Sequence, residues 1–119
     1  MKPQELGIYG EKLAVKLLLE KRHTILTQNY RKGRGELDIV STDGEMLVIT
    51  EVKTRNSDAL GAPYYAVSRK KQSQIVKLTN AYILENKLMN EVRFDIISIV
   101  HNQYRTTIEH IEEAFYPTA

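Results

Sequence analysis

Apolar side chains recur at helical spacing in two stretches of the chain. Residues 3–22 predict an amphipathic helix, because one stripe of such a helix would be polar and the remainder largely apolar. Pro3 suits its start, where a missing backbone N–H costs nothing. Residues 66–86 predict a second helix, whose apolar stripe comprises Ile75, Leu78 and Tyr82.

Elsewhere the apolar positions alternate, which is the pattern of β-strands. Residues 92–100 predict a strand, and residues 106–111 predict a short edge strand. Asp43-Gly44 separates two further apolar runs and predicts a β-hairpin, because glycine readily takes the positive φ of a tight turn. The predicted fold class is therefore α/β, a single domain over residues 1–119 in the order α-β-β-β-α-β-β, with a mixed central sheet flanked by helices.

The predicted hairpin brings acidic residues together. A two-residue turn at Asp43-Gly44 would place Asp38 diagonally opposite Glu51, about 7–8 Å away. Because strand side chains alternate between faces, four charged residues would share one face. They are Glu36, Asp38, Glu51 and Lys53. Two carboxylates that reach across such a gap can hold a divalent cation between them.

A solvated hairpin, whose charges serve only solubility, is the alternative. Apolar residues on both faces of these strands count against it, since charged groups in covered strands are costly unless they are paired or bound to metal. Neighbouring carboxylates should also raise the pKa of at least one of them by repulsion.

Glu11 breaks the pattern of the first helix. It lies off the polar stripe, at the margin of the core-facing side, and the glycines Gly7 and Gly10 beside it indicate close approach of another element. Glu11 either forms a salt bridge at the edge of the helix or reaches a site on the sheet. Two other polar residues stand out: Gln72 faces inward in the predicted helix and could satisfy backbone groups or serve the site, and Asp95 is expected to pair with a nearby cation.

Composition limits the function classes without selecting one. With 42% hydrophobic and 27% charged residues, the chain has no apolar run near the length of a membrane-spanning helix. There is no cysteine, and the three histidines His23, His101 and His110 are scattered, so we expect each at the surface or an edge rather than in a zinc site. Without an export signal, the expected location is cytoplasmic.

The net charge is only +2, so local basic clusters must carry any argument for nucleic-acid binding. Arg31-Lys32-Gly33-Arg34 precedes the first acidic strand, and Arg69-Lys70-Lys71 opens the second helix. Each cluster alone is better explained by a solvated loop or helix end. The hairpin register places Arg34 opposite Lys53, however, so the first cluster should flank the acids as phosphate-positioning cations would. Tyr64 and Tyr65 could stack on a base or pack on the domain.

Several short motifs, taken in order, resemble a known family. They are Gly10-Glu11, Asn29-Tyr30-Arg31, the segment 35–40, the segment 51–55, Val67 with Lys71-Gln72, and Arg93-Phe94-Asp95. They resemble the YraN-like family of uncharacterised bacterial proteins (UPF0102), which is in turn similar to PD-(D/E)XK nucleases and archaeal Holliday junction resolvases. The resemblance runs from about Gly7 to Phe115 and implies a restriction-endonuclease-like fold.

The resemblance also implies residue roles. Asp38 matches the motif aspartate, Glu51 the second metal-binding acid, Lys53 the motif lysine, and Glu11 the glutamate that resolvase-like members present from the first helix. It implies a metal-dependent endonuclease that uses Mg²⁺ or Mn²⁺, held by Asp38, Glu51 and Glu11, to cleave DNA, including structured or branched DNA. The cations expected to bind nucleic acid are Arg31, Lys32, Arg34, Arg55, Arg69 and Lys70.

Three residues depart from the pattern of that superfamily. Leu37 stands where the name-giving proline would be, Thr50 where an apolar strand residue is usual, and His23 where the first helix often ends on glycine. Resolvase-like activity would need a two-fold homodimer. Two alternatives stay open: a nucleic-acid-binding protein of nuclease fold that does not cleave, and a protein-interaction module.

Overall fold

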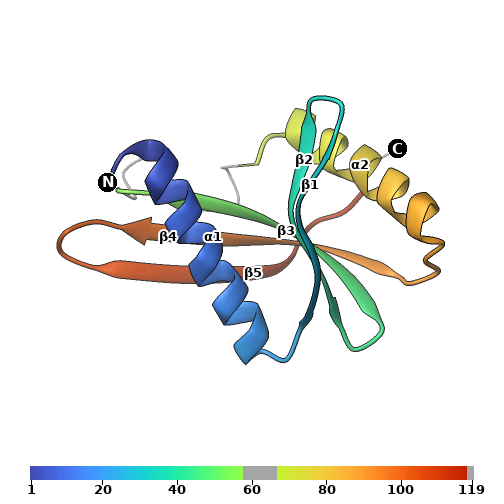
Figure 1. The fold of residues 1–119 in the computed structure, drawn as a ribbon, viewed down its shortest axis with the longest axis horizontal. Coiled ribbons are helices and arrows are strands. Elements are labelled where there is room, and N and C mark those ends of the chain that lie inside the picture. The colour runs from blue at the N-terminus through green and yellow to red at the C-terminus, as the bar shows by residue number, and fades with distance from the viewer. Residues whose placement is uncertain (58–66, 118–119) are drawn as a thin grey trace.

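The computed structural model describes residues 1–57 and 67–117. In this part of the chain two helices and five strands follow one another in the predicted order (Figure 1). Their bounds are α1 Pro3–Glu20, β1 Thr24–Lys32, β2 Gly35–Asp43, β3 Met46–Arg55, α2 Arg69–Asn86, β4 Val92–His101 and β5 Thr106–Phe115. The last strand is longer than the sequence predicts. Neither helix within the described residues is long and apolar enough to cross a lipid bilayer.

The five strands form one mixed sheet, as predicted. Their spatial order, β1-β2-β3-β4-β5, follows the sequence. Neighbouring strands are antiparallel except β3 and β4, which are parallel. Parallel neighbours need a crossover connection, and α2 belongs to the segment that joins these two strands.

The two helices cover opposite faces of the sheet. On β4, Ile97 and Ile99 pack with Ala14 and Leu18 of α1. The alternate β4 residues Phe94 and Ile96 pack in the core that α2 closes. A strand covered on both faces is apolar almost throughout, which explains the nearly continuous hydrophobic sequence of β4.

Gly10 lets α1 lie directly on β3. A Cβ atom at Gly10 would fall 1.7 Å from Oγ1 of Thr54, so any larger residue would push the helix away from the sheet. The close approach that the glycines indicate is therefore real at Gly10. It brings the next residue, Glu11, down to the level of the sheet.

The turn between β2 and β3 lies one residue later than predicted. Asp43 pairs with Met46, so Gly44 and Glu45 are the two central residues. Gly44 has a φ of 61° at the first central position, as a type II′ turn requires, whereas the predicted placement needs positive φ at Asp43. Moving the turn by one residue shifts each partner by two, so every side chain keeps its face.

Candidate active site

Strands β2 and β3 separate at one end of their shared ladder. Their pairing ends at Ile39 and Thr50. Beyond that point β2 continues with β1, and β3 continues with β4. Figure 1 shows the β1–β2 hairpin rising away from β3. We name this separation the fork, and its two arms are residues 35–38 of β2 and residues 51–55 of β3.

Asp38 and Glu51 are the first residues of the two arms. With the observed turn their positions are opposite rather than diagonal, one step beyond the last paired residues, Ile39 and Thr50. The charge of Asp38 acts on the pKa of Glu51, so their carboxyl groups lie close together. Oδ2 of Asp38 accepts a hydrogen bond from the backbone N–H of Val52 at 2.8 Å. The Asp38 and Glu51 carboxyl groups are also hydrogen-bonded to each other. The fork therefore begins with a linked pair of acids.

Burial keeps this pair from ionising fully. The Glu51 residue is only 6% exposed, and burial, followed by the charge of Asp38, raises the pKa of Glu51 to about 8. Burial also raises the pKa of Asp38, against the hydrogen bonds from Val52 and Glu51, which lower it. Near neutral pH the Glu51 carboxyl group thus keeps its proton and donates a hydrogen bond to Asp38. A divalent cation bound to the pair would have to displace that proton.

Two lysines approach Glu51 from different elements. Nζ of Lys71, in the first turn of α2, lies 3.8 Å from Oε1 of Glu51. Lys53 follows two residues after Glu51 on β3. Both oppose the effect of burial on the pKa of Glu51, Lys71 more strongly than Lys53. The sequence predicts Lys53 at the site but not Lys71, although Lys71 continues the inward-facing stripe of the second helix.

A third carboxylate reaches the fork from α1. Burial raises the pKa of Glu11 to about 7, and the charges of Asp38 and Glu36 add to this effect. Glu11 is therefore near enough to both acids to be influenced by them. Its role at a site stays a prediction.

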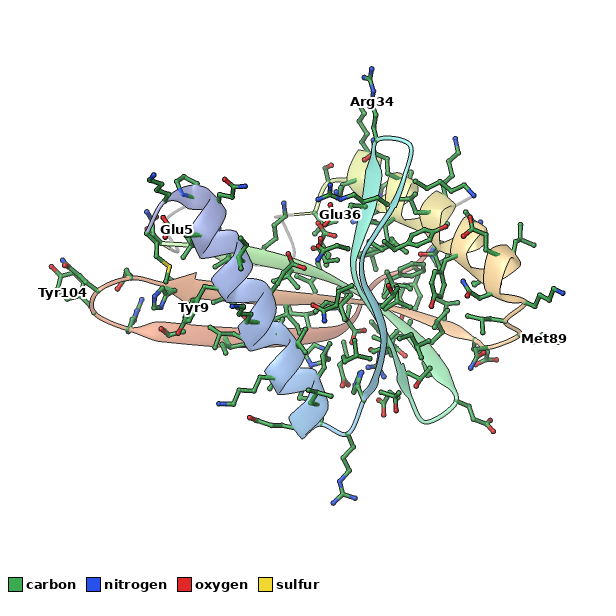
Figure 2. The ribbon with its side chains drawn as sticks, in the orientation of Figure 1. Glu5, Tyr9, Arg34, Glu36, Met89 and Tyr104 are labelled. Atoms are coloured by element: carbon green, nitrogen blue, oxygen red, sulfur yellow. The ribbon has the colours of Figure 1, made fainter. Side chains whose placement is uncertain are left out.

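Glu36 is a fourth carboxylate, and it points from the hairpin toward the side on which β3 and α1 lie (Figure 2). Its Oε2 accepts a hydrogen bond from Nε of Arg31 at 2.9 Å. Its Oε1 accepts one from the side-chain amide of Asn29 at 2.6 Å, and the same amide donates to Oε1 of Glu11 at 3.1 Å when its nitrogen faces the acids. The sequence predicts no role for Asn29.

The hairpin cations do not all lie where the sequence predicts. Arg34 is at the outer end of the β1–β2 hairpin, pointing away from the sheet (Figure 2). The predicted pairing of Arg34 with Lys53 is wrong, because only residues 39–43 of β2 pair with β3, and Arg34 lies outside this ladder. Arg31 is beside the fork and its side chain is 74% exposed. Lys32 forms an ion pair with Glu85 of α2.

The other predicted cations lie at the ends of two elements. Arg69 and Lys70 are exposed in the first turn of α2, next to the lysine that contacts Glu51. Arg55 is the last residue of β3. Nε2 of Gln72 donates to the backbone carbonyl of Val67 at 3.1 Å, so its backbone-satisfying role is the one observed. The predicted stacking candidates Tyr64 and Tyr65 lie outside the described residues.

A second set of charged side chains lies near the C-terminal end of α1. Asp95 is fully buried and accepts hydrogen bonds from Nε and Nη2 of Arg93 at 2.9 and 3.0 Å. It is also hydrogen-bonded to Nε2 of His110 at 2.8 Å and to the N–H of Glu113 at 3.1 Å. These contacts, with the charge of Arg93, outweigh burial and hold the pKa of Asp95 below its usual value. Asp95 is thus paired with a cation, as predicted.

His23 and Asp43 complete this set. Nδ1 of His23 is hydrogen-bonded to Oγ of Ser41 at 2.9 Å, and Nε2 lies 3.8 Å from Oδ2 of Asp43. Asp43 in turn accepts a hydrogen bond from Arg93 at 3.2 Å. The predicted surface position is wrong for His23, which is 5% exposed. The imidazole of His110 is 3% exposed although its strand is at the sheet edge. We name the set the Arg93 cluster; it comprises His23, Asp43, Arg93, Asp95 and His110.

The chain is similar to a family of bacterial proteins over most of its length. The sequence profile described as "Uncharacterised protein family UPF0102" matches residues 10–99. A UPF0102 protein of Christiangramia forsetii is 46% identical over 112 residues, which cover 94% of each chain. One of Thermodesulfovibrio yellowstonii is also 46% identical over 112 residues, covering 94% of this chain and 96% of the relative. One of Phocaeicola vulgatus is 43% identical over 113 residues, covering 95% and 93%. The chain therefore belongs to the uncharacterised protein family UPF0102.

Proposed function

We propose that this protein is a divalent-cation-dependent nuclease that hydrolyses phosphodiester bonds in DNA, including structured or branched DNA. The observation that carries the proposal is the buried Asp38–Glu51 pair, in which the pKa of Glu51 is raised to about 8. Buried acids that lack balancing charge lower the stability of a fold. Their presence at a fork of the sheet is explained if a cation completes the charge balance.

The donor atoms at the fork fit Mg²⁺ or Mn²⁺. Across residues 1–57 and 67–117 no three His, Asp or Glu side chains are grouped as a ready metal-binding set. Mg²⁺, however, commonly binds one or two carboxylates and keeps several water ligands. Asp38 and Glu51 would hold the cation, and Glu11 would bind it or a water beside it. When bound, such a cation lowers the pKa of a water molecule and neutralises charge on the phosphate.

The other fork residues suit the remaining chemistry. Glu11, with a pKa of about 7, can take a proton from the attacking water near neutral pH. Lys53 presents an ammonium group beside the acid pair, where it would orient the water or balance the charge that develops on the phosphate. Lys71 would share that second role from α2.

Cations on two sides of the fork would contact the DNA backbone. The hairpin provides Arg31, Lys32 and Arg34, and the start of α2 provides Arg69 and Lys70. Arg55, at the end of β3, lies on the arm that carries Lys53. Such contacts fix the position of DNA on a protein without reading its sequence.

The proposal is tested by pairing cleavage and binding assays on the same variants. The substrates are single-stranded, duplex, flap and four-way-junction DNA and a matched RNA, with and without Mg²⁺ or Mn²⁺. We expect cation-dependent cleavage of DNA by the wild type. Asp38→Asn and Lys53→Ala should lower the cleavage rate by about 10²–10⁴-fold while DNA affinity stays nearly unchanged. Glu109→Gln, which alters an exposed carboxylate on β5, is the matched control and should change neither quantity.

Each negative result of these assays favours a different alternative function. Salt-sensitive DNA binding without cleavage under any condition would make the protein a non-cleaving nucleic-acid-binding member of the nuclease fold. Absence of both binding and cleavage would favour the protein-interaction module.

Cleavage of a four-way junction would further require a two-fold homodimer, because symmetric cuts need two sites and this domain carries one fork. Of the apolar residues that could line such an interface, Ile108 on the edge strand β5 is 40% exposed. Ile111 and Phe115 instead pack in the core under α2. Sedimentation that shows a monomer with and without junction DNA would leave nicking or flap cleavage as the activity.

A further inference from the structure

We propose that Asn29 is a positioning residue that holds Glu11 at the fork, with Glu36 as its anchor. The inference deepens the proposed function and rests on it, because it concerns how the third carboxylate is set for a cation. It gives roles to two residues, Asn29 and Glu36, that neither the sequence motifs nor the Asp38–Glu51 pair account for.

The first support is the placement of one amide between two acids. With its nitrogen turned toward the acids, the side-chain amide of Asn29 lies 2.6 Å from Oε1 of Glu36 and 3.1 Å from Oε1 of Glu11. An amide nitrogen carries two N–H groups, so it can donate to both carboxylates at once. Without this bridge the two carboxylates would repel each other, and Glu11 would be free to swing away from the fork.

The second support is that Glu36 is fixed from its other side. Its Oε2 accepts the hydrogen bond from Nε of Arg31 at 2.9 Å. Both oxygens of Glu36 are thus held by side chains of β1, one by Arg31 and one by Asn29. Glu36 is therefore held from two sides, and it can anchor the amide that contacts Glu11.

The third support is the backbone at Asn29. Its φ of 53° lies in the left-handed region, which is unusual inside a β-strand and which asparagine tolerates better than most residues. A strained conformation of this kind persists only where surrounding contacts require it. Here it accompanies the placement of the amide between Glu36 and Glu11, which come from β2 and α1.

Residues that hold a metal-binding side chain in place contribute strongly to metal affinity. Their loss typically weakens binding by about 10–100-fold. Glu11 needs such support more than Asp38 does, since Asp38 is already fixed by the N–H of Val52 at 2.8 Å. The long side chain of Glu11 extends from a helix and is held at the sheet by Asn29.

The main experiment is an Mn²⁺ titration by calorimetry on metal-free protein. Asn29→Gly removes the amide and keeps a residue that accepts the left-handed backbone. Lys87→Gly is the matched control, because Lys87 has the same φ of 53° at the C-cap of α2, remote from the fork. We expect Asn29→Gly to raise the dissociation constant about 10–100-fold and Lys87→Gly to leave it unchanged. In a Glu11→Gln background, Asn29→Gly should add no further loss.

A second readout needs no metal. The side-chain amide signal of Asn29 in ¹H–¹⁵N spectra should shift in both Glu11→Gln and Glu36→Gln and stay in place in Glu109→Gln. An Asn29 amide signal that does not shift in Glu11→Gln or in Glu36→Gln would overturn the inference. So would an Asn29→Gly effect on Mn²⁺ affinity of the same size with and without Glu11, because Asn29 would then act through the fold in general.

These outcomes are separate from those of the proposed function. A protein that cleaves no nucleic acid, but whose Asn29 amide responds to Glu11 as expected, would refute the nuclease and retain the positioning role. Cation-dependent cleavage that Asn29→Gly leaves unchanged would support the nuclease and refute the positioning role.

Discussion

The fork and the Arg93 cluster both bury acids in the same sheet, but they balance the charge in opposite ways. In the Arg93 cluster, Asp95 is surrounded by donors, and its pKa is held below the usual value despite complete burial. At the fork, Asp38 faces another acid, and burial raises the pKa of both Asp38 and Glu51. Within residues 1–57 and 67–117, the charge of Asp95 is balanced by its neighbours, whereas the pKa of Glu51 stays raised despite two nearby lysines.

The difference is the one expected between a structural site and the functional site that we propose. A buried charge whose hydrogen bonds all come from the same chain stabilises one arrangement of that chain and has little further chemistry to offer. Acids whose pKa values are raised by burial and by one another are typical of sites that bind a cation or transfer a proton. The lysines at the fork, Lys53 and Lys71, lower the pKa of Glu51 without bringing it back to its ordinary value.

The largest expected effect comes from breaking the Arg93 cluster. Asp95→Asn removes the anion that pairs with Arg93 and leaves a guanidinium group, whose side chain is 11% exposed, without its main partner. We expect the free energy of unfolding in urea at pH 7 to fall by about 3 kcal/mol. Glu112→Gln is the control, because Glu112 also contacts Arg93, at 3.6 Å, but is 51% exposed; it should cost less than about 0.5 kcal/mol. Equal losses would show that Asp95 is not the centre of the cluster.

Removing a carboxylate charge at the fork should raise the free energy of unfolding instead of lowering it. Glu51→Gln removes an acid that is held partly protonated, and its amide can still donate to Asp38. Without divalent cations at pH 8 we expect the free energy of unfolding to rise by about 1 kcal/mol. Mn²⁺ at 100 times its dissociation constant should stabilise the wild type by about 2.7 kcal/mol and the variant far less. Loss of stability in Glu51→Gln, or no response of the wild type to Mn²⁺, would mean that the fork is not a cation site.

Much of this contrast can be predicted from the sequence. Helical and alternating spacings identify the elements because they depend only on local geometry. The proximity of Asp38 and Glu51 follows from the hairpin register, and it survives a turn that lies one residue later than predicted, at Gly44-Glu45. Asp-Gly indicates a tight turn but does not say whether glycine takes its first or second central position.

What the sequence does not predict depends on contacts between distant segments. The register that would place Arg34 opposite Lys53 assumes that β2 and β3 stay paired, whereas the hairpin leaves the sheet. His110 is buried because Asp95, 15 residues earlier in the chain, lies beside it on the neighbouring strand. No spacing rule predicts the strand separation, the burial of His110 or the placement of Asn29 between Glu11 and Glu36.

The pH dependence of stability should sharpen the comparison further. In metal-free protein, Glu11 and Glu51 have folded-state pKa values of about 7 and about 8, against an ordinary glutamate value of 4.5. The folded state therefore keeps protons that the unfolded state releases, and the contribution of these two groups to stability should fall as pH rises from about 4.5 to about 8. Each group contributes at most about 1.4 kcal/mol per pH unit.

The Arg93 cluster should control the acid side of the same curve. Burial lowers the pKa of His23 from 6.5, so its contribution to stability is lost as pH falls below 6.5, because the unfolded state takes up a proton first. Between pH 6.5 and 4.5 this loss opposes the gain from Glu11 and Glu51. Asp95, with a lowered pKa, adds to the loss only below 3.8. Melting temperatures measured in a chelator from pH 4 to 9 test both limbs. The double variant Glu11→Gln/Glu51→Gln should remove the fall in stability between pH 6.5 and 8 and expose the loss below pH 6.5 that His23 causes, and a slope that persists above pH 6.5 would assign it to other groups.

The smallest expected effect concerns DNA affinity at the two sites. Arg34 and Lys70 are exposed cations on the fork side, whereas Lys21 lies beside the Arg93 cluster, with its Nζ 2.8 Å from Nδ1 of His110. Each substitution to alanine removes one positive charge, so net charge alone predicts three equal losses of affinity. If the fork is where DNA lies, Arg34→Ala and Lys70→Ala should each lower the slope of log affinity against log salt by about 0.9, the value for one phosphate contact, and Lys21→Ala should not. Equal slopes for all three variants would mean that DNA is attracted by overall charge and is not placed at the fork.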